Sequence, residues 1–379
     1  MNCFLLRLPG ATSILGGSAE ELEKGIGDGF FFASFDEPSR IYRIPSEIRE
    51  FPLTTLSNTS LRIGDESVTR NIFTDFLQFK EIEECIKSNG AGLASVSYPE
   101  STSREEYIGY VKHAKERIAC LEAISGKPTK IVTSRVKVSS TSAISPIELF
   151  LKLCDKYPEA CVFLFSTQEY GTWIGASPEL LLAASEGHIK SMALAGTRKR
   201  DSSENWDRKN LEEQAIVTDY IAGKFVDAGL HPEVSGPHTH AHGPVEHLET
   251  TIIARSDASK PEMNNLSASL MASLSPTPAL SGFPKEEAIE FLKSTEKHHR
   301  ELYGGYFGIH KNGEVSAYVN LRSAKFLPTS DSICLYAGGG ITKDSDPSAE
   351  WTETEMKLST LETLLSTPRP FPPQVLPRL

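Results

Sequence analysis

Acidic and basic side chains recur at helical spacing near the C-terminus, shortly after three consecutive glycines. The run Ala337-Gly338-Gly339-Gly340-Ile341 closes an apolar strand, and Glu350, Glu353 and Lys357 then share one face of a predicted helix. Consecutive glycines let a backbone approach a ligand closely and point N–H groups at an anion. Two carboxylates on one face repel each other unless a cation such as Mg²⁺ joins them. A solvated charged face is the alternative, and this segment alone favours it.

Two other positions could carry acid–base chemistry. Lys130 leads an apolar strand, where burial would favour the neutral amine that a general base needs. Glu179 lies between the turn residue Pro178 and an apolar strand, where apolar walls could keep the carboxyl protonated as an acid. The alternative is a charged side chain in solvent. It is favoured for Lys130 on local evidence, whereas the two alternatives for Glu179 weigh equally.

Three histidines alternate at His238, His240 and His242, so a strand would place them on one face. Zinc or copper could bind there, but no nearby cysteine or carboxylate completes a site, and exposed histidines are favoured. The sequence contains no GxGxxG, Walker, GxSxG or HExxH motif. Common nucleotide, serine-hydrolase and zinc-protease chemistries are therefore unsupported.

Composition excludes several classes of partner. The 379 residues carry a formal net charge of −11, which argues against non-specific nucleic-acid binding. Six scattered cysteines without a CxxC pair favour reduced thiols. The N-terminus does not resemble a signal peptide, and no apolar stretch approaches a membrane span of about 20 residues. We expect a cytoplasmic protein that does not associate with membranes.

The order of predicted elements favours an α+β architecture over an alternating parallel sheet, because strands occur both in hairpin-like succession and between helices. Ser103 and Ser145-Pro146 are typical helix starts. The solvent-exposed face of the helix predicted over 204–225 would contain Lys209, Glu212 and Glu213. The predicted helices cover 103–124, 145–153, 204–225, part of 284–303 and a segment from 347; the predicted strands cover 29–32, 41–44, 130–136, 161–165, 172–175, 180–184, 189–194, 314–326 and 332–337.

Taken together, nine co-linear segments resemble the chorismate-utilising enzymes, namely isochorismate, salicylate, anthranilate and aminodeoxychorismate synthases. The segments are Lys130-Ile-Val-Thr-Ser-Arg135, Gly175-Ala-Ser-Pro-Glu-Leu-Leu-Leu182, Ala193-Leu-Ala-Gly-Thr197, Glu213-Gln-Ala-Ile-Val217, Ser275-Pro-Thr-Pro-Ala-Leu-Ser-Gly-Phe-Pro284, Glu301-Leu-Tyr-Gly-Gly305, Asn320-Leu-Arg-Ser-Ala-Lys325, Ala337-Gly-Gly-Gly-Ile341 and Glu350-Trp-Thr-Glu-Thr-Glu-Met-Lys357. Matching order and spacing make the set far more specific than any one segment.

The resemblance implies the chorismate-binding fold, which is similar to aminodeoxychorismate synthase: two packed antiparallel sheets surrounded by helices. It implies a chorismate-binding catalytic region over residues 101–366. Residues 1–100 would be the N-terminal part of the same domain, without a motif, and 367–379 would be a proline-rich tail.

The resemblance also implies a set of site residues for chorismate and Mg²⁺. Glu213 and Glu353 would bind Mg²⁺, with Glu350 close by. Arg322, Lys357 and the amides of Gly338, Gly339 and Gly340 would hold the carboxylates of chorismate. The remaining substrate contacts would be Gly196, Thr197, His247, Leu280 and Tyr303.

Within the family, the residues favour hydration at ring carbon C2, with Lys130 as the base for water and Glu179 as the acid for the C4 hydroxyl. Anthranilate synthases resemble one another in carrying glutamine at the position of Lys130. Aminodeoxychorismate synthases typically place a nucleophilic lysine at Ala195, and salicylate synthases tend to have threonine at Leu280. Ser275 departs from a frequent histidine, and Gly339 from a frequent alanine. Neither departure removes a catalytic group.

The implied activity is therefore that of an isochorismate synthase, an isomerase, feeding menaquinone or siderophore biosynthesis. No glutamine amidotransferase subunit is expected, and the chain would be a monomer or weak oligomer. Three alternatives stay open: a salicylate synthase, which goes on to eliminate pyruvate; an inactive chorismate-binding regulatory relative; and a scaffold whose proline-rich tail recruits the next enzyme.

Overall fold

The computed structural model describes residues 1–53, 80–89, 99–141, 144–185, 187–200, 205–242, 245–327 and 331–365. The predicted proline-rich tail, residues 367–379, lies outside the described residues, as does part of the predicted N-terminal segment. No helix within these ranges is both long enough and apolar enough to cross a bilayer.

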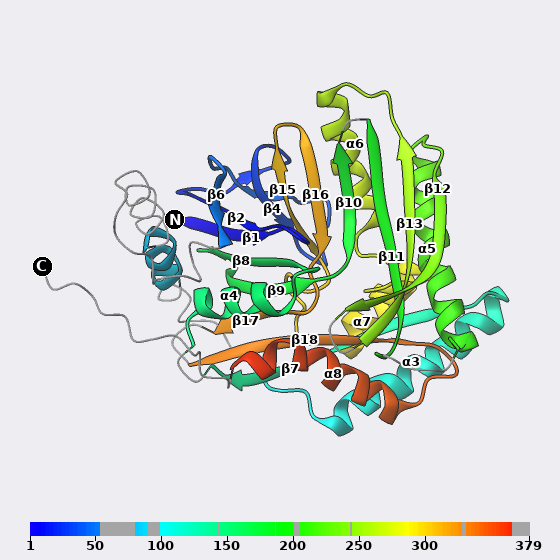
Figure 1. The fold of residues 1–379 in the computed structure, drawn as a ribbon. Helices are drawn as coiled ribbons and strands as arrows, with labels where there is room; N and C mark the ends of the chain where they lie inside the picture. Colours follow the sequence, from blue (N-terminus) through cyan, green and yellow to red (C-terminus); the bar gives the residue numbers. More distant parts are fainter. Residues whose placement is uncertain are drawn as a thin grey trace, which may run out of the picture.

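Two antiparallel sheets form the centre of the protein (Figure 1). The strands of the first sheet, which we call sheet A, follow the order β14 (Gly282–Phe283), β7 (Lys130–Ser140), β18 (Ser332–Ile341), β17 (Ser323–Leu327), β9 (Gly171–Ser177), β8 (Cys161–Thr167), β1 (Asn2–Arg7), β2 (Ser13–Ala19) and β6 (Arg49–Pro52). Those of sheet B follow the order β12 (Glu233–His242), β13 (Val245–Arg255), β11 (His188–Lys199), β10 (Leu180–Ser185), β16 (Glu314–Val319), β15 (Tyr306–Lys311), β4 (Gly29–Ala33), β5 (Tyr42–Ile44) and β3 (Glu23–Lys24). The predicted α+β class and the two-sheet architecture are confirmed.

Helices cover the outer faces of the two sheets. In the described ranges they are α3 (Arg104–Ser125), α4 (Pro146–Lys156), α5 (Arg208–Asp227), α6 (Lys260–Leu274), α7 (Lys285–Thr295), α8 (Pro347–Leu365) and a helical segment over residues 80–89. Helices α4 and α8 share an apolar cluster with sheet A, while α5 and α6 pack on strands of sheet B. The chain therefore forms helix, sheet, sheet and helix layers.

Helix ends follow the local sequence. Ser103 begins α3 with a capping box, in which its hydroxyl accepts from the N–H of Glu106 and the Glu106 carboxylate accepts from the N–H of Ser103. Gly126 ends α3 at φ 65°, a left-handed conformation that glycine adopts without a steric penalty. Helix α5 begins at Arg208 rather than at the predicted residue 204, because Asp207 caps it.

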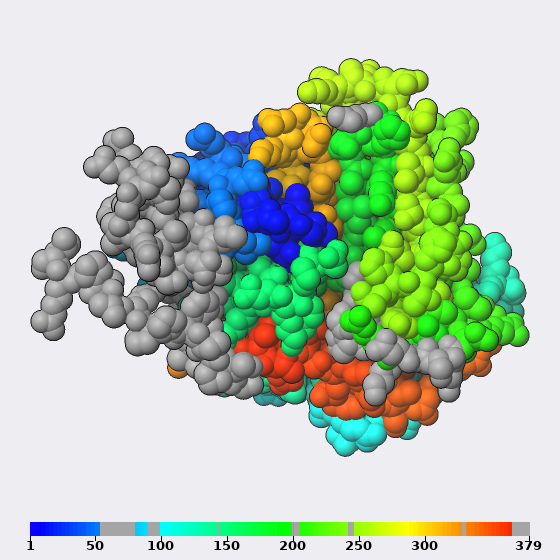
Figure 2. All heavy atoms as spheres, in the orientation of Figure 1, coloured from blue at the N-terminus to red at the C-terminus, as the bar shows by residue number. Residues whose placement is uncertain are grey.

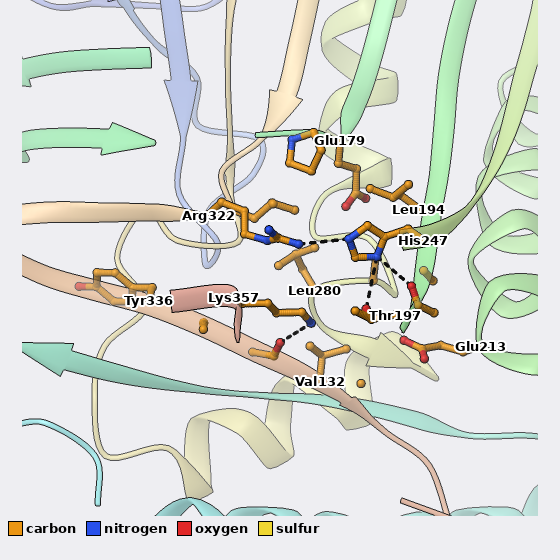
Figure 3. A pocket seen from close by; sticks show the side chains of 18 of the residues that line it. Val132, Glu179, Leu194, Thr197, Glu213, His247, Leu280, Arg322, Tyr336 and Lys357 are labelled. Atoms are coloured by element: carbon orange, nitrogen blue, oxygen red, sulfur yellow. Dashed lines mark hydrogen bonds between the residues drawn. The ribbon is translucent and has the colours of Figure 1, made fainter. Parts of the chain in front are cut away.

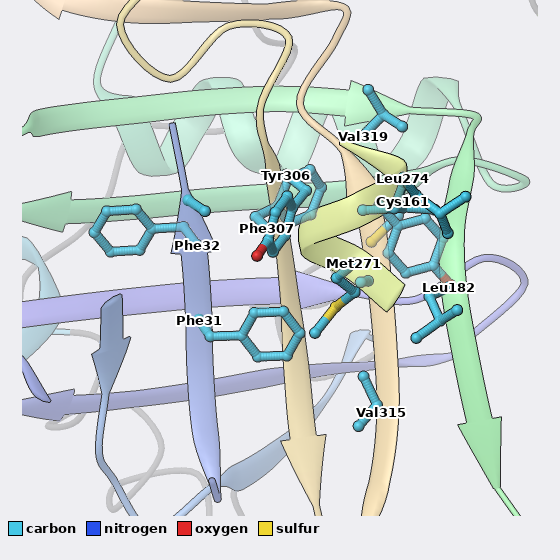
Figure 4. Close-up of a cluster of buried hydrophobic side chains, with 14 of the residues drawn as sticks. Phe31, Phe32, Cys161, Leu182, Met271, Leu274, Tyr306, Phe307, Val315 and Val319 are labelled. Atoms are coloured by element: carbon cyan, nitrogen blue, oxygen red, sulfur yellow. The ribbon is translucent and has the colours of Figure 1, made fainter. Parts of the chain in front are cut away.

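Aromatic side chains join the two sheets. On β4 the side chains alternate, so Phe30 and Phe32 contact Phe165 of sheet A, while Phe31 points to the opposite face, toward Tyr306 and Met271 of α6 (Figure 4). Phe163 and Phe307 approach to 4.0 Å between ring centroids. This contact fixes sheet A against sheet B through β8 and β15.

The first 53 residues contribute strands to both sheets. Strand β1 pairs with β8 in the middle of sheet A, and β4 pairs with β15 in sheet B. In the space-filling view the blue N-terminal residues lie between green residues of the 150–180 region and orange residues near 310 (Figure 2). The N-terminal segment is thus part of the same core as the strands of the predicted catalytic region.

The strand predicted over residues 314–326 is two strands in the structure. Strand β16 ends at Val319 in sheet B and β17 begins at Ser323 in sheet A. Between them Arg322 has φ 49°, a left-handed conformation that breaks the extended chain. The prediction failed because this crossing depends on contacts from both sheets, and an arginine gives no local turn signal.

The aromatic contact between the sheets predicts a large effect of truncation on stability. Phe30 is fully buried, with its ring centroid 5.1 Å from that of Phe4 and 5.0 Å from that of Phe165. We expect Phe30→Ala to lower the free energy of unfolding by about 3–5 kcal/mol, measured by urea denaturation. Ile124→Ala, at an 84% exposed position, is the control and should change it by less than about 0.5 kcal/mol. Equal effects would contradict the role of this contact.

Candidate active site

A cavity of about 630 Å³, its open mouth included, lies where strands of sheet A face strands of sheet B. Its walls come from β7 and β18 of sheet A, β11 and β13 of sheet B, helices α5 and α8, and four connecting segments around residues 178, 280, 303 and 321. Side chains from all of these elements point toward one another in Figure 3. Segments far apart in the sequence therefore meet in one concave site.

Most of the predicted site residues line this cavity. They are Lys130, Glu179, Gly196, Thr197, Glu213, His247, Leu280, Tyr303, Arg322, Gly338, Gly340 and Lys357. Three predicted residues, Gly339, Glu350 and Glu353, do not line it. A Cβ on Gly339 would instead meet Glu350 and the hydroxyl of Tyr107, so this residue faces α8 and α3 and not the cavity.

Three lysine–glutamate ion pairs lie in or beside the cavity wall, and the lining residues among them are Lys130, Glu213 and Lys357. The Nζ–Oε1 distance is 2.7 Å in each of the pairs Lys130–Glu213, Lys209–Glu350 and Lys357–Glu353. Burial disfavours a charge on Glu353, but Lys357 outweighs burial and lowers the pKa of Glu353. Burial and the neighbouring Glu353 raise the pKa of Glu350. Each pair places a carboxylate against an amine in a mostly buried part of the protein.

Glu179 stands apart from these ion pairs. It is buried at the start of β10, and its Oε1 has no hydrogen-bond partner among the described residues. Burial raises the pKa of this carboxyl from 4.5 to about 8, although Lys130 and Lys357 partly oppose the shift. The structure therefore places a largely protonated carboxylic acid in the cavity wall at neutral pH, which is one of the two alternatives that the flanking residues of Glu179 left open.

Arg322, His247 and Gly196 form a hydrogen-bonded chain along one wall (Figure 3). Arg322 Nη2 lies 3.1 Å from His247 Nε2, and His247 Nδ1 lies 2.8 Å from the carbonyl oxygen of Gly196. Arginine can only donate, so Nε2 is the acceptor and Nδ1 carries the proton that Gly196 accepts. His247 is therefore neutral, and it orients a buried guanidinium suited to a carboxylate.

The glycines of β18 are required by the neighbouring carboxylates. A Cβ on Gly340 would lie 2.4 Å from Glu213 Oε1, and a Cβ on Gly339 would lie 2.8 Å from Glu350 Oε2. Lys357 Nζ donates to the carbonyl oxygen of Gly338 at 2.8 Å. Any larger residue at Gly340 would thus displace the Lys130–Glu213 pair.

Sequence reasoning misjudged or missed several residues. The local pattern of α5 alone favoured a solvent-exposed face containing Lys209, Glu212 and Glu213. That interpretation is wrong for Lys209 and Glu213, whose side chains form the inward ion pairs. It is correct for Glu212, which pairs with Arg208 at the surface. Tyr336, which stacks on Tyr303 with 5.3 Å between ring centroids, was not singled out. The alternating apolar residues of β18 indicate that Tyr336 is buried. The same pattern is found for any core residue, so it does not identify Tyr336 as part of the site.

The alternating histidines lie on β12, an edge strand of sheet B, away from the cavity. His240 Nδ1 is 2.6 Å from a carboxylate oxygen of Glu249. Across the described ranges, no three His, Cys, Asp or Glu side chains converge as metal ligands. His238 and His240 are exposed, which confirms that part of the expectation, and the side chain of His242 lies outside the described part of the structure.

Comparisons with known proteins find one family throughout. The profile described as chorismate binding enzyme matches residues 54–366. The chain is 30% identical over 276 residues to the isochorismate synthase EntC of Escherichia coli, covering 69% of this chain and 67% of EntC. It is 31% identical over 287 residues to the isochorismate synthase MenF of Bacillus subtilis, covering 72% of this chain but only 58% of that relative. The structure of the menaquinone-specific isochorismate synthase MenF of Escherichia coli aligns with TM-score 0.69 and 20% identity over 97% of this chain and 89% of that one.

The raised pKa of Glu179 makes a prediction about stability. The folded protein keeps this proton to a higher pH than the unfolded chain does. The free energy of unfolding therefore decreases as pH rises from 4.5 to about 8, and above that pH the loss stays constant. We expect Glu179→Gln to be more stable than the parent by a few kcal/mol at pH 8, with the difference vanishing near pH 4.5. Urea denaturation at both pH values measures it, with Glu159→Gln as the exposed control. Equal stability of parent and variant at pH 8 would contradict the assignment.

Proposed function

Because the chain belongs to the chorismate-binding enzymes, we propose that it is an isochorismate synthase, an isomerase that converts chorismate reversibly to isochorismate. The observation that carries the proposal is a buried, protonated Glu179 in the same cavity as Lys130. Exchange of a ring hydroxyl requires both an acid for the departing oxygen and a base for the entering water. The cavity supplies one candidate for each role.

The charged groups of the cavity suit a substrate with two carboxylates. Arg322 presents a planar guanidinium, and Lys357 lies beside the glycine segment of β18. Tyr303 and Leu280 add an aromatic and an aliphatic surface for a ring and its enolpyruvyl ether. Burial strengthens each of these contacts because water does not compete for them.

In the proposed reaction Lys130, in its neutral amine form, takes a proton from water, and the water oxygen attacks ring carbon C2. Glu179 gives its proton to the C4 hydroxyl, which leaves as water while the ring double bond shifts. The substrate and product are isomers, so the protein contributes position and charge and no external driving force. The Lys130–Glu213 pair holds the lysine at a fixed place in the wall.

We also propose that Mg²⁺ binds beside the cavity through Glu213 and Glu353, with Glu350 close by. Glu350 Oε2 is buried without a hydrogen-bond partner among the described residues, and Gly339 and Gly340 leave room where a side chain would collide with the carboxylates. These features fit a hard cation that takes one or two protein carboxylates and completes its shell with substrate oxygens and water. When bound, Mg²⁺ supplies positive charge to a substrate carboxylate.

Two residues support water over ammonia as the nucleophile, namely Lys130, where anthranilate synthases carry glutamine, and Ala195. Ala195 occupies the position where aminodeoxychorismate synthases typically carry a nucleophilic lysine, and it lines the cavity. A methyl group cannot form a covalent bond with the ring. We therefore propose that no glutamine amidotransferase subunit is needed.

A product assay tests the proposed function directly. Purified protein is incubated with chorismate, with and without Mg²⁺, and the products are separated by chromatography and mass spectrometry. We expect an isomer of unchanged mass that forms only with Mg²⁺. Salicylate plus pyruvate would reassign the chain to the salicylate synthases, and binding of chorismate without turnover would indicate an inactive relative.

The protonated form of Glu179 also predicts how the turnover rate depends on pH. The acid form is required for turnover, and it is lost as pH rises through about 8. We expect kcat to fall above this pH and Glu179→Gln to reduce kcat by at least about 100-fold while chorismate still binds, as measured by calorimetry. Glu159→Gln serves as the control, since it changes an exposed carboxyl. An unchanged kcat in Glu179→Gln would refute the acid assignment.

A further inference from the structure

Arg300 lies behind the cavity wall and contacts the backbone of three lining residues. Its Nη1 donates to the carbonyl oxygen of Leu280 at 2.7 Å, and its Nη2 donates to that of Val132 at 2.6 Å. The carbonyl oxygen of Arg300 accepts from the N–H of Tyr303 at 2.8 Å. Leu280, Val132 and Tyr303 line the cavity, whereas Arg300 itself does not. One buried arginine thus connects three separate parts of the wall.

Glu296 completes the arrangement. It is the residue after α7, and its two oxygens accept from Arg300 Nε at 2.8 Å and Nη2 at 2.6 Å. Its Oε1 also accepts from the N–H of Ser134 at 2.6 Å and from the Ser134 hydroxyl at 3.0 Å. Both carboxylate oxygens therefore have partners. Burial disfavours a charge on Glu296, but Arg300 outweighs burial, so the pKa of Glu296 is lowered.

The Glu296–Arg300 pair provides hydrogen bonds to the edge of β7 that a neighbouring strand would otherwise provide. Strand β14 pairs with β7 only at Lys130 and Ile131. Beyond that point, the carbonyl oxygen of Val132 and the N–H of Ser134 bond to Arg300 and Glu296. On the other side of β7, Val132 and Ser134 pair with Gly340 and Gly338 of β18. The ion pair consequently holds the part of β7 that supports the glycine segment.

We propose that Glu296 and Arg300 act as a positioning unit, which we call the wall clamp, that sets the spacing of Val132, Leu280 and Tyr303 around the bound ring. This inference rests on the proposed function, because it presumes a substrate held between Lys130 and Glu179. Neither clamp residue touches the substrate. The planar fork of arginine suits this role, since it bonds several acceptors in fixed directions and a lysine ammonium does not.

Arg300→Lys tests the clamp by keeping the charge and removing the fork. Misplacing a reacting group by about 1 Å can cost about 100-fold in rate. We expect kcat for chorismate to fall about 10- to 100-fold, while KM changes less than about threefold because the substrate-binding cations remain. The double variant Glu296→Gln/Arg300→Lys should lose no more than about twofold beyond Arg300→Lys, since both residues serve one unit.

Arg7 provides a matched control. It is equally buried, and its guanidinium donates to the backbone carbonyl oxygens of Tyr157, Pro158 and Ala160, none of which lines the cavity. Arg7→Lys removes the same kind of contact and should keep kcat within about twofold of the parent. Thermal midpoints of both variants show whether they lose stability equally.

The outcomes separate the clamp from the proposed function. A parent enzyme that turns over chorismate, with Arg300→Lys within twofold of its kcat, would overturn the clamp and leave the proposed function intact. Equal losses of kcat in Arg300→Lys and Arg7→Lys would also overturn it, because any buried arginine would then behave alike. If Arg300→Lys does not fold, Glu296→Gln decides: a fall in kcat of about fivefold or more supports the clamp, and an unchanged kcat refutes it. If the parent enzyme does not turn over chorismate, the proposed function is refuted, and the clamp, which rests on it, is refuted with it.

Discussion

Lys130 and Glu213 meet at 2.7 Å in a part of the protein that solvent barely reaches, and much of the surrounding structure serves that contact. A buried charge is costly unless an opposite charge and hydrogen bonds compensate it. The pair joins β7 to α5, and Lys209 then joins α5 to Glu350 of α8. Helix α8 in turn reaches β18 through the bond from Lys357 to Gly338. Two ion pairs and one hydrogen bond therefore connect two strands of sheet A with helices α5 and α8 beside one cavity.

This requirement explains why β18 ends in glycine. The carboxylates of Glu213 and Glu350 lie where side chains of Gly340 and Gly339 would otherwise stand. Glycine usually weakens a strand, because it contributes no side chain to pack. Here the aromatic contacts between the sheets and the buried Glu296–Arg300 pair stabilise the surrounding strands, which compensates for the missing side chains of the glycines. The flexible residue type is thus held in place by rigid neighbours.

Glu179 departs from the pattern of compensated charge. The nearby lysines are bonded to other acceptors, so burial dominates and the carboxyl keeps its proton. Such a group lowers stability at neutral pH, and proteins tend to retain costly groups of this kind where chemistry requires them. The structural cost and the proposed catalytic role of Glu179 therefore have the same origin, which is the burial of its carboxyl group without a hydrogen-bond partner for Oε1 among the described residues.

The sequence by itself determined the α+β class, the helix starts at Ser103 and Ser145, and the motifs that meet in the cavity. These features depend on local capping, periodicity and the order of short segments, which a linear chain displays directly. Taken singly, however, Lys130, Glu213 and Glu353 were indistinguishable from solvated charges. Only the tertiary structure decided that Lys209 faces inward, that Gly339 turns away from the cavity, and that Arg300 supports its wall. The reason is physical: burial and charge pairing are set by residues up to about two hundred positions away, so no local pattern can contain them.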